Sequence, residues 1–447
     1  MINKFKSLLF KEVDPLRLNV FRFLFAFILI LQFGTYTSAG FIERGIIAPA
    51  TLFHFDLLPF IKPFPLAGMK FVLLLTLIGP MMMFFRKTLK IGALIYLFSF
   101  GYLFFLEESY YNNHFYLILI FTAFWLFYKP HVDSKGNESI PFWQLFIFVF
   151  MLVLVYFYGG LVKINYDWLI NQQPTRVLLG LNAQSSSYPD ILNSEFAVMY
   201  ITYGGIIFDL CIGFFLVWRK TFKVAVILSI LFHVTNHFIF NLGEGGNIGI
   251  FPMMMIGANV LFTSPDKFRK FLSKFLPGIT PLYTTSTLDV DINSKSNKTT
   301  FAVISAFLII QLVLPFRPYA FGADMHWTGQ ASYFGWRMKV NSKESKVKFY
   351  VRYAENETPQ EINIGRIINT MQIDMMAQHV DMIYKFSQYL KHRLAKESGK
   401  TPIITADILV GLNGREMQAI VDPNTNLANI TYSPWSKPDW VLPMKDE

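Results

Sequence analysis

Three short polar motifs interrupt apolar stretches of membrane length, and they hold the residues best suited to chemistry. The motifs are EESYYNNHFYL at residues 107–117, GGLVKINYDW at 159–168 and LFHVTNHF at 231–238. A Lys, His or Asn inside a bilayer is energetically costly and by default marks a functional site. If the motifs meet on one side of the membrane, they predict a pocket for a hydrophobic ligand with a polar head.

Lys163, in the second motif, is the strongest candidate for proton transfer. It could be a lysine at a helix end whose ammonium lies among the lipid headgroups. Alternatively, it is a desolvated lysine, neutral enough to act as a base. Two glycines precede it, and Asn165, Asp167 and Trp168 follow closely, which favours the second interpretation. Asp167 could equally pair with Lys163 and keep it charged and inert.

The other two motifs offer histidines and amides for binding a ligand. His233 and His237 lie four residues apart, so a helix places both on one face. A metal pair is one alternative, but the motif lacks the Glu of a zinc protease helix, and we expect no metal. A packing histidine and a ligand-binding histidine remain. Asn112, Asn113 and His114 could form a helix N-cap, a ligand contact or both.

The composition indicates an integral membrane protein. The 447 residues are 53% hydrophobic and only 16% charged, whereas soluble domains have about 25% charged residues. The net charge of +10 comes from basic residues between apolar segments, so we expect no nucleic-acid partner. Cys211 is the only cysteine, which excludes an intrachain disulfide.

Nine apolar segments approach the roughly 17–25 residues that cross a bilayer. They predict an all-α polytopic membrane domain at residues 1–316. The expected spans are 17–35, 67–85, 91–107, 114–128, 142–162, 197–217, 222–241, 246–263 and 299–316.

The basic residues alternate between the connecting loops. They are frequent before the first segment and after the second, fourth, sixth and eighth, as at Arg219, Lys220 and Lys223. The positive-inside bias therefore places the N-terminus in the cytoplasm. Nine spans then put the C-terminal region outside, and all three polar motifs fall on the exoplasmic side.

Residues 317–447 predict a small exoplasmic α+β domain. The segment 339–357 alternates polar and apolar residues as half-buried strands do, and 368–398 has the spacing of an amphipathic helix. The segment 405–423 reads as two strands around the turn residues Asn413 and Gly414.

Taken together, the motifs closely resemble the vitamin K-dependent γ-glutamyl carboxylase family, whose membrane part is called the HTTM domain. The matching segments are DPLRLNVFRFLFAFILI (14–30), YNNHFYL (111–117), PFWQ (141–144), VYFYGGLVKINYDW (155–168), LFHVTNHF (231–238), GADMHWTGQASYFGWRMKV (322–340) and VDPNTNLANITYSPWSKPDWVLP (421–443). They occur in family order over nearly the whole chain.

The resemblance implies an enzyme of the carboxy-lyase type. The family oxidises vitamin K hydroquinone with O₂ to an epoxide and adds CO₂ to a peptide glutamate. Its catalytic lysine matches Lys163, its vitamin-binding Asn-His pair matches Asn113 and His114, and another active-site histidine matches His233. The expected site comprises Lys163 and His233 as catalytic residues, Asn112, Asn113, His114, Asn236 and Trp168 for the cofactor, and Trp327, Tyr333, Trp336 and Arg337 for the substrate.

The cofactor expected from the resemblance is a reduced menaquinone or phylloquinone, with O₂ and CO₂ as co-substrates. The expected partners are the lipid bilayer, a glutamate-containing peptide or protein, and a quinone reductase that recycles the cofactor. The expected location is a bacterial inner membrane or the endoplasmic reticulum. Two alternatives are a quinol-oxidising enzyme without peptide carboxylation and a non-catalytic quinone-binding or transport protein.

Overall fold

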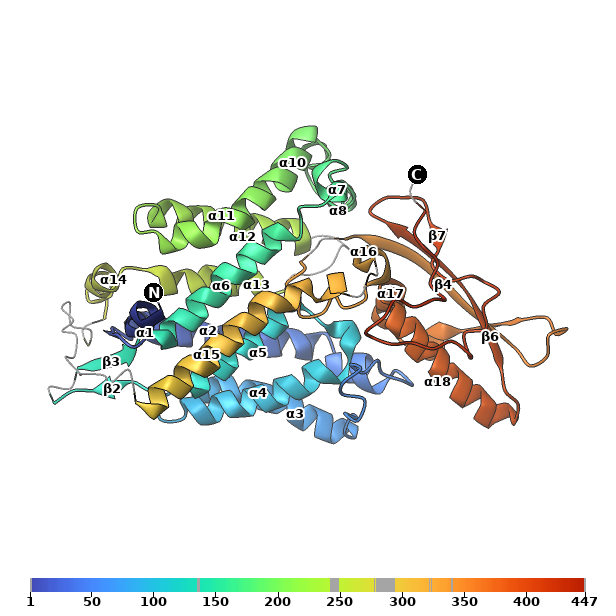
Figure 1. The fold of residues 1–447 in the computed structure, drawn as a ribbon, viewed down its shortest axis with the longest axis horizontal. Helices are drawn as coiled ribbons and strands as arrows, with labels where there is room; N and C mark the ends of the chain where they lie inside the picture. Colours follow the sequence, from blue (N-terminus) through green and yellow to red (C-terminus); the bar gives the residue numbers. More distant parts are fainter. Residues whose placement is uncertain are drawn as a thin grey trace.

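The chain folds into a helical bundle with a smaller sheet-containing domain packed at one end (Figure 1). The computed structural model describes residues 2–134, 137–241, 249–276, 278, 294–320, 322, 324–338 and 341–445. Two parts of the sequence-based predictions lie outside these residues: the start of the eighth apolar segment, at 246–248, and residues 339–340 of the predicted strand region.

Six helices in the described part of the chain are long and apolar enough to cross a membrane. Five of them are α2 (Leu16–Ser38), α3 (Leu66–Met83), α4 (Leu89–Leu106), α6 (Trp143–Leu161) and α15 (Lys295–Val313), which a 3₁₀ turn (Leu314–Ala320) extends. The sixth runs through α10 (Glu195–Met199), a π-helical turn (Tyr200–Gly204) and α11 (Gly205–Val217).

Three further apolar helices are counted as shorter, at 10–17 residues, with α12 counted over Phe222–Phe238. They are α5 (Asn113–Leu126), α12 (Phe222–Asn241) and α13 (Phe251–Ala258), which continues into a 3₁₀ turn (Asn259–Phe262). The structure thus confirms a mostly helical chain with six candidate membrane-spanning helices. It does not confirm the predicted count of nine spans, because length and composition qualify only six of the described helices.

Short elements connect and flank these helices. The helical ones are α1 (Ile2–Leu9), a π-helical turn (Phe41–Ile47), a 3₁₀ turn (Glu108–Tyr110), α7 (Tyr166–Leu169), α8 (Thr175–Gln184), α9 (Pro189–Leu192) and α14 (Pro265–Leu272). The strands β1 (Glu12–Val13), β2 (His131–Val132) and β3 (Glu138–Pro141) form a small antiparallel sheet in the order β1-β3-β2.

Glycines bring α6 and α11 into close contact. A Cβ atom on Gly160 of α6 would lie 2.8 Å from Leu210 Cγ, and one on Gly213 of α11 would lie 3.0 Å from Val153 Cα. Small residues at such crossings let helix backbones approach closely, which is how membrane helices gain packing energy. The same contact fixes the C-terminal end of α6, from which Lys163 projects, against the middle of α11.

The C-terminal domain contains a four-stranded antiparallel sheet in the order β5-β4-β6-β7. Its strands are β4 (Lys343–Arg352), β5 (Gln360–Ile362), β6 (Ile403–Leu412) and β7 (Gln418–Ala419). In β4 and β6, Lys343 pairs with Leu412 and Arg352 with Ile403. Every second residue of β6 is buried, as a strand with one covered face requires.

Helices cover one face of this sheet. They are α17 (Thr370–Gln378) and α18 (Val380–Ser398), preceded by the short α16 (Met325–Thr328) and a 3₁₀ turn (Ile364–Arg366). Sequence periodicity predicted one helix over 368–398, but His379 adopts an extended conformation and divides it in two. The predicted strands on either side of Asn413 and Gly414 are present.

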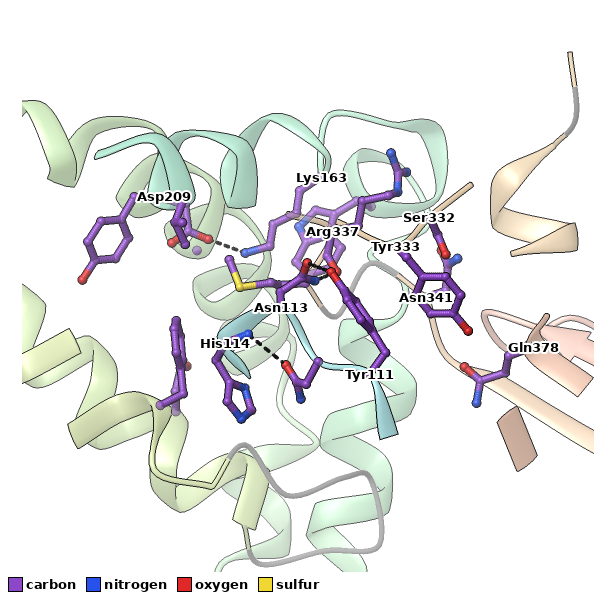
Figure 2. A pocket seen from close by; sticks show the side chains of 18 of the residues that line it. Tyr111, Asn113, His114, Lys163, Asp209, Ser332, Tyr333, Arg337, Asn341 and Gln378 are labelled. Carbon is purple, nitrogen blue, oxygen red and sulfur yellow. Dashed lines mark hydrogen bonds and ion pairs between the residues drawn. The ribbon is translucent and has the colours of Figure 1, made fainter. Parts of the chain in front are cut away.

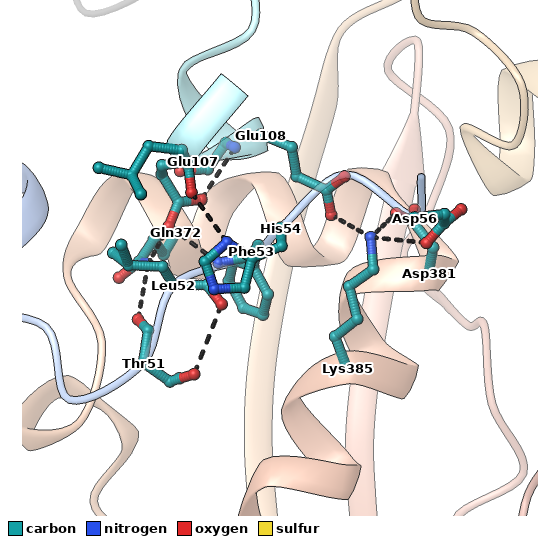
Figure 3. Close-up of polar contacts among 12 residues, drawn as sticks. Thr51, Leu52, Phe53, His54, Asp56, Glu107, Glu108, Gln372, Asp381 and Lys385 are labelled. Atoms are coloured by element: carbon teal, nitrogen blue, oxygen red, sulfur yellow. Dashed lines mark hydrogen bonds and ion pairs between the residues drawn. The ribbon is translucent and has the colours of Figure 1, made fainter. Parts of the chain in front are cut away.

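Polar contacts fasten the C-terminal domain to the loops at the end of the bundle (Figure 3). The carboxylate of Glu107, just after α4, accepts hydrogen bonds from Phe53 N at 2.9 Å and from Gln372 Nε2 of α17 at 2.8 Å. Beside it, Lys385 Nζ of α18 lies 2.6 Å from Glu108 Oε1 and also contacts Asp56 and Asp381. Burial raises the pKa of Glu107 to about 7.

Candidate functional site

A cavity of about 410 Å³ lies where the helical bundle meets the C-terminal domain. Its inner wall comes from α5, α6, α11, α12 and α13, and its outer wall from residues 325–338 and 341–343 and the end of α17. Figure 2 shows both groups: Asp209, Lys163 and His114 at one side, and Tyr333, Asn341 and Gln378 at the other. The three polar motifs of the sequence therefore meet in one place.

Lys163 lies in the wall of this cavity, one residue beyond the C-cap of α6. Its Nζ is 2.5 Å from Asp209 Oδ2 and 5.1 Å from the ring centroid of Trp168. Both side chains of the pair are about nine-tenths buried, at 11% and 10% exposure. Trp168 is itself fixed, because its Nε1 donates to Thr202 O. The ammonium is therefore not among lipid headgroups but faces a carboxylate inside the protein.

Asp209 is an inner-wall residue that was not predicted from the sequence. It lies in α11, in the otherwise apolar run from Gly205 to Val217, and it lines the cavity. The signal was present, because a lone carboxylate within a membrane-length segment is a functional candidate by default. Its partner was not visible in the sequence, since Lys163 lies 46 residues away.

Asp167, the acid expected as a possible partner of Lys163, pairs elsewhere. Its Oδ1 lies 2.5 Å from Arg415 Nη2, and its Oδ2 accepts from Asn413 Nδ2 at 2.8 Å. Burial opposes the ionisation of Asp167, but hydrogen bonding to Arg415 lowers its pKa overall. Asp167 thus links α7 to the turn after β6, and closeness in sequence to Lys163 was misleading.

The first motif places its amides in two different roles. Asn112 is the N-cap of α5, and its side chain accepts from His114 N at 3.3 Å, so the expected capping is present. Asn113 Oδ1 accepts from the Tyr111 hydroxyl at 2.9 Å, and its Nδ2 donates to Arg337 O at 2.7 Å. All three residues of the Asn-Asn-His sequence line the cavity. Asn113 also connects the inner and outer walls.

His233 is buried in α12 and lines the cavity together with Asn236. Its Nε2 lies 2.7 Å from the Tyr156 hydroxyl of α6, so this contact fixes the ring. His237, the second histidine of the motif, is not part of the cavity wall. Among the residues that the structure describes, no three His, Cys, Asp or Glu side chains are grouped to hold a metal ion.

The expected substrate-binding residues divide into two groups. Tyr333 and Arg337 line the outer part of the cavity. Trp327 and Trp336 are instead packed into hydrophobic cores. Trp327 donates from Nε1 to Leu442 O at 2.8 Å, and Trp336 stacks on Tyr116 with the ring centroids 5.0 Å apart. Neither tryptophan is among the residues that line the cavity.

Several outer-wall residues were not anticipated from the sequence. Lys343 at the start of β4 and His379 between α17 and α18 both line the cavity. Burial lowers the pKa of Lys343 to about 7 and the pKa of His379 to about 4. No spacing rule connects residues from different elements, so only the packing of the C-terminal domain onto the bundle could place them here.

The residues present fit a reduced quinone. The cavity lies within the roughly 300–1,000 Å³ common for small-molecule sites. Apolar side chains of Val155, Phe232, Phe251 and Met255 provide a wall for a fused ring. Polar groups on Asn113, His114, Lys163 and His233 provide partners for hydroxyl groups, which are both donors and acceptors.

Two known families match the chain in sequence. The chain matches the HTTM domain over residues 10–267 and the vitamin K-dependent gamma-carboxylase lumenal domain over residues 296–447. No solved structure matches the chain. The matches account for both the apolar helices and the sheet-containing domain, and together they cover every residue that lines the cavity. This protein therefore belongs to the vitamin K-dependent gamma-carboxylase family.

Proposed function

We propose that this protein couples oxidation of a menaquinone-type hydroquinone to its epoxide with the addition of CO₂ to a peptide glutamate. The observation that carries the proposal is the buried Lys163–Asp209 pair, which opens onto a cavity shared with Asn113, His114 and His233. The reduced quinone, when bound, supplies with O₂ the oxidative chemistry that drives removal of the glutamate γ-proton. Dioxygen is reduced to the epoxide oxygen and water, and a carbon–carbon bond to CO₂ replaces the carbon–hydrogen bond.

The Lys163–Asp209 pair supports proton removal from a bound hydroxyl. At 2.5 Å the two groups can share a proton, and the pair as a whole is neutral when it holds only that one. Lys163 Nζ can pass its proton to Asp209 Oδ2 and take another from the ligand. The pair then carries one positive charge, which stabilises the oxyanion left beside it in a site of low dielectric constant.

The surrounding residues support orientation and water exclusion. Asn113 is anchored by Tyr111 and by the backbone of Arg337, so its amide is held rigid at the cavity wall. His233 is anchored by Tyr156. Fixed partners of this kind hold a reacting hydroxyl close to its base. The proton transfer then needs no chance encounter, because the two groups are already oriented. The apolar side chains of the cavity wall keep bulk water away from the site while the strong base is present.

We further propose the membrane arrangement that the chemistry needs. Residues 1–316 span the bilayer nine times with the N-terminus in the cytoplasm, and residues 317–447 lie on the exoplasmic side of a bacterial inner membrane or the endoplasmic reticulum. The matched lumenal domain supports an exoplasmic C-terminal region. A glutamate-bearing protein would reach the cavity from that side, and a quinone reductase in the same membrane would recycle the cofactor.

The proposal is tested in membranes that contain the full chain, supplied with reduced menaquinone or phylloquinone, O₂, CO₂ and a glutamate peptide. The wild type is expected to form quinone epoxide and to increase the peptide mass by one CO₂. Lys163→Ala is expected to lose at least about a hundredfold in both products, because general-base catalysis typically contributes 10²–10⁴-fold. Lys70→Ala is the matched control, since Lys70 forms only an exposed ion pair with Glu43.

The products distinguish the alternatives. Epoxide without a mass gain would identify a quinol-oxidising enzyme that does not carboxylate peptides. Quinone binding without oxygen consumption would identify a non-catalytic binding or transport protein. Equal epoxide formation by the wild type and Lys163→Ala would refute the assignment of Lys163 as the base.

A further inference from the structure

We propose that Lys343 is the residue that binds the side-chain carboxylate of the glutamate substrate at the outer end of the cavity. This inference rests on the proposed function, and it assigns one side of the cavity to the peptide and the other to the quinone. Three features of the outer wall support it: the hydrogen bonds of the Lys343 ammonium, the charges of the lining residues and the unpaired hydroxyl of Tyr333.

The ammonium of Lys343 is held in place with one donor to spare. Its Nζ donates to Trp327 O at 2.6 Å and to Gln378 O at 2.9 Å. A lysine ammonium has three donors, so two backbone carbonyls leave one N–H for another partner. Lys343 belongs to the cavity wall, and that remaining donor is available to an occupant of the cavity.

The convergence of these two carbonyls depends on Gly329. A Cβ atom at this position would lie 2.3 Å from Gln378 O, and the backbone has a positive φ of 70°. Glycine thus lets the segment after α16 and the end of α17 approach each other around the ammonium. Backbone carbonyls from two different elements therefore hold the Lys343 ammonium in place, so it is not freely mobile in solvent.

The charges around Lys343 select an anion. Arg337 is a second cation of the outer wall, and Asp209 is the one carboxylate among the described residues that line the cavity. Asp209 is already paired with Lys163 at the inner end. His379 is neutral near pH 7, because burial lowers its pKa to about 4. The described outer lining therefore contains cations and no carboxylate, and Asp324 acts electrostatically on Lys343 from outside that lining.

Tyr333 is a further donor of the outer wall, and Glu108 and Asp381 act on it electrostatically. The Tyr333 hydroxyl is buried and has no hydrogen-bond partner among the described residues. Buried polar groups are nearly always paired, and an unpaired one in a cavity wall fits a group that waits for a ligand. A carboxylate accepts through two oxygens, so a glutamate bound to Lys343 has an acceptor left for a second donor of the outer wall.

A purely structural role for Lys343 makes a different prediction. If Lys343 only bound the two carbonyls, it would need N–H donors, and the cavity would show no preference for a charged ligand. Binding a carboxylate needs the positive charge, because charge-assisted hydrogen bonds are roughly twice as strong as neutral ones. The preference of the protein for glutamate over glutamine in otherwise identical peptides therefore separates the two roles.

The experiment measures peptide affinity for the full chain in lipid nanodiscs, with two fluorescent peptides that differ only in Glu or Gln. The wild type is expected to bind the Glu peptide at least about tenfold more tightly. Lys343→Met is expected to bind both peptides equally, and Lys343→Arg to retain the preference. Lys343→Gln keeps a donor for the carbonyls without the charge, so it tests the same point if the Met variant does not fold.

Each outcome decides the inference. A preference for Glu that persists in Lys343→Gln and Lys343→Met, or that is absent from the wild type, would overturn it. Because the measurement is of binding, it does not depend on turnover. A Lys343-dependent preference in a protein that forms no carboxylated product would support the carboxylate site while refuting the proposed reaction.

Discussion

At the scale of single residues, the central feature is an ammonium and a carboxylate placed together away from water. Such pairs are weak sources of stability, because the desolvation of both charges offsets much of their attraction. Lys163 and Asp209 are nevertheless held at 2.5 Å, and Lys163 lies over the ring of Trp168. A pair that contributes little to folding but opens onto a cavity is suited to moving a proton.

Replacing Asp209 with Asn tests this interpretation. The amide can still hydrogen bond to Lys163 but cannot take up its proton. We expect Asp209→Asn to reduce the rate of epoxide formation by at least about tenfold, with little change in the KM for the reduced quinone. The control is Asp167→Asn, which weakens the contact to Arg415 but leaves the Lys163–Asp209 pair intact. A wild-type rate for Asp209→Asn would show that Asp209 only supports the packing.

At the scale of elements, helix ends decide where the site residues lie. The end of α6 delivers Lys163 to the middle of α11 because Gly160 lets the two helices touch. The end of α17 delivers Gln378 and His379 to the outer wall because the helix stops there. Just beyond the break, α18 begins and carries Lys385 toward the loop after α4.

Lys385 is expected to be the main polar link between α18 and that loop. Burial alone would lower its pKa, but the surrounding carboxylates raise it above its usual value. Lys385→Met would leave Glu108 and Asp381 buried without their cation, at a cost of about 3–5 kcal/mol. We therefore expect a clearly lower midpoint of thermal unfolding in detergent.

The matched control is Lys348→Met, which removes an ion pair to Glu361 whose side chains are both more than half exposed. Exposed pairs contribute about 0–1 kcal/mol, so its unfolding midpoint should remain close to that of the wild type. Equal midpoints for the two variants would show that the cluster around Lys385 does not stabilise the docking of the domain.

At the scale of the whole molecule, the cavity belongs to neither part of the chain alone. Helices of the bundle supply the groups suited to a quinone, and the C-terminal domain supplies those suited to a carboxylate. The two domains are joined there by Asn113 with Arg337 and by Asp167 with Arg415. A lipid-soluble reductant and a water-soluble peptide can thus approach one site from two phases.

The proposed nine-span topology places the two ends of the chain on opposite sides of the membrane. The test replaces Cys211, the only cysteine, with Ala and introduces one cysteine at Lys4 or Lys400, both exposed. A membrane-impermeant maleimide applied to intact cells or right-side-out vesicles should label Lys400→Cys alone, and both variants after permeabilisation. Labelling of both before permeabilisation, or of Lys4→Cys alone, would contradict the proposed nine-span topology.

The sequence by itself determined the apolar helices, the sheet of the C-terminal domain and most of the polar residues that line the inner part of the cavity. These features are local: segment length, alternation along β6 and the cost of His233 or Lys163 in a bilayer depend only on neighbouring residues. The order of the motifs also predicted the family, which the matches confirmed.

Only the tertiary structure decided which groups meet. Lys163 pairs with Asp209 and not with the nearby Asp167, because close contacts at glycines hold α6 against α11. These two helices lie far apart in the sequence. Trp327 is packed in the core of the C-terminal domain, whereas Lys343 lines the cavity. Which side chains are buried and which line the cavity depends on how the two domains pack. No local sequence pattern predicts that packing.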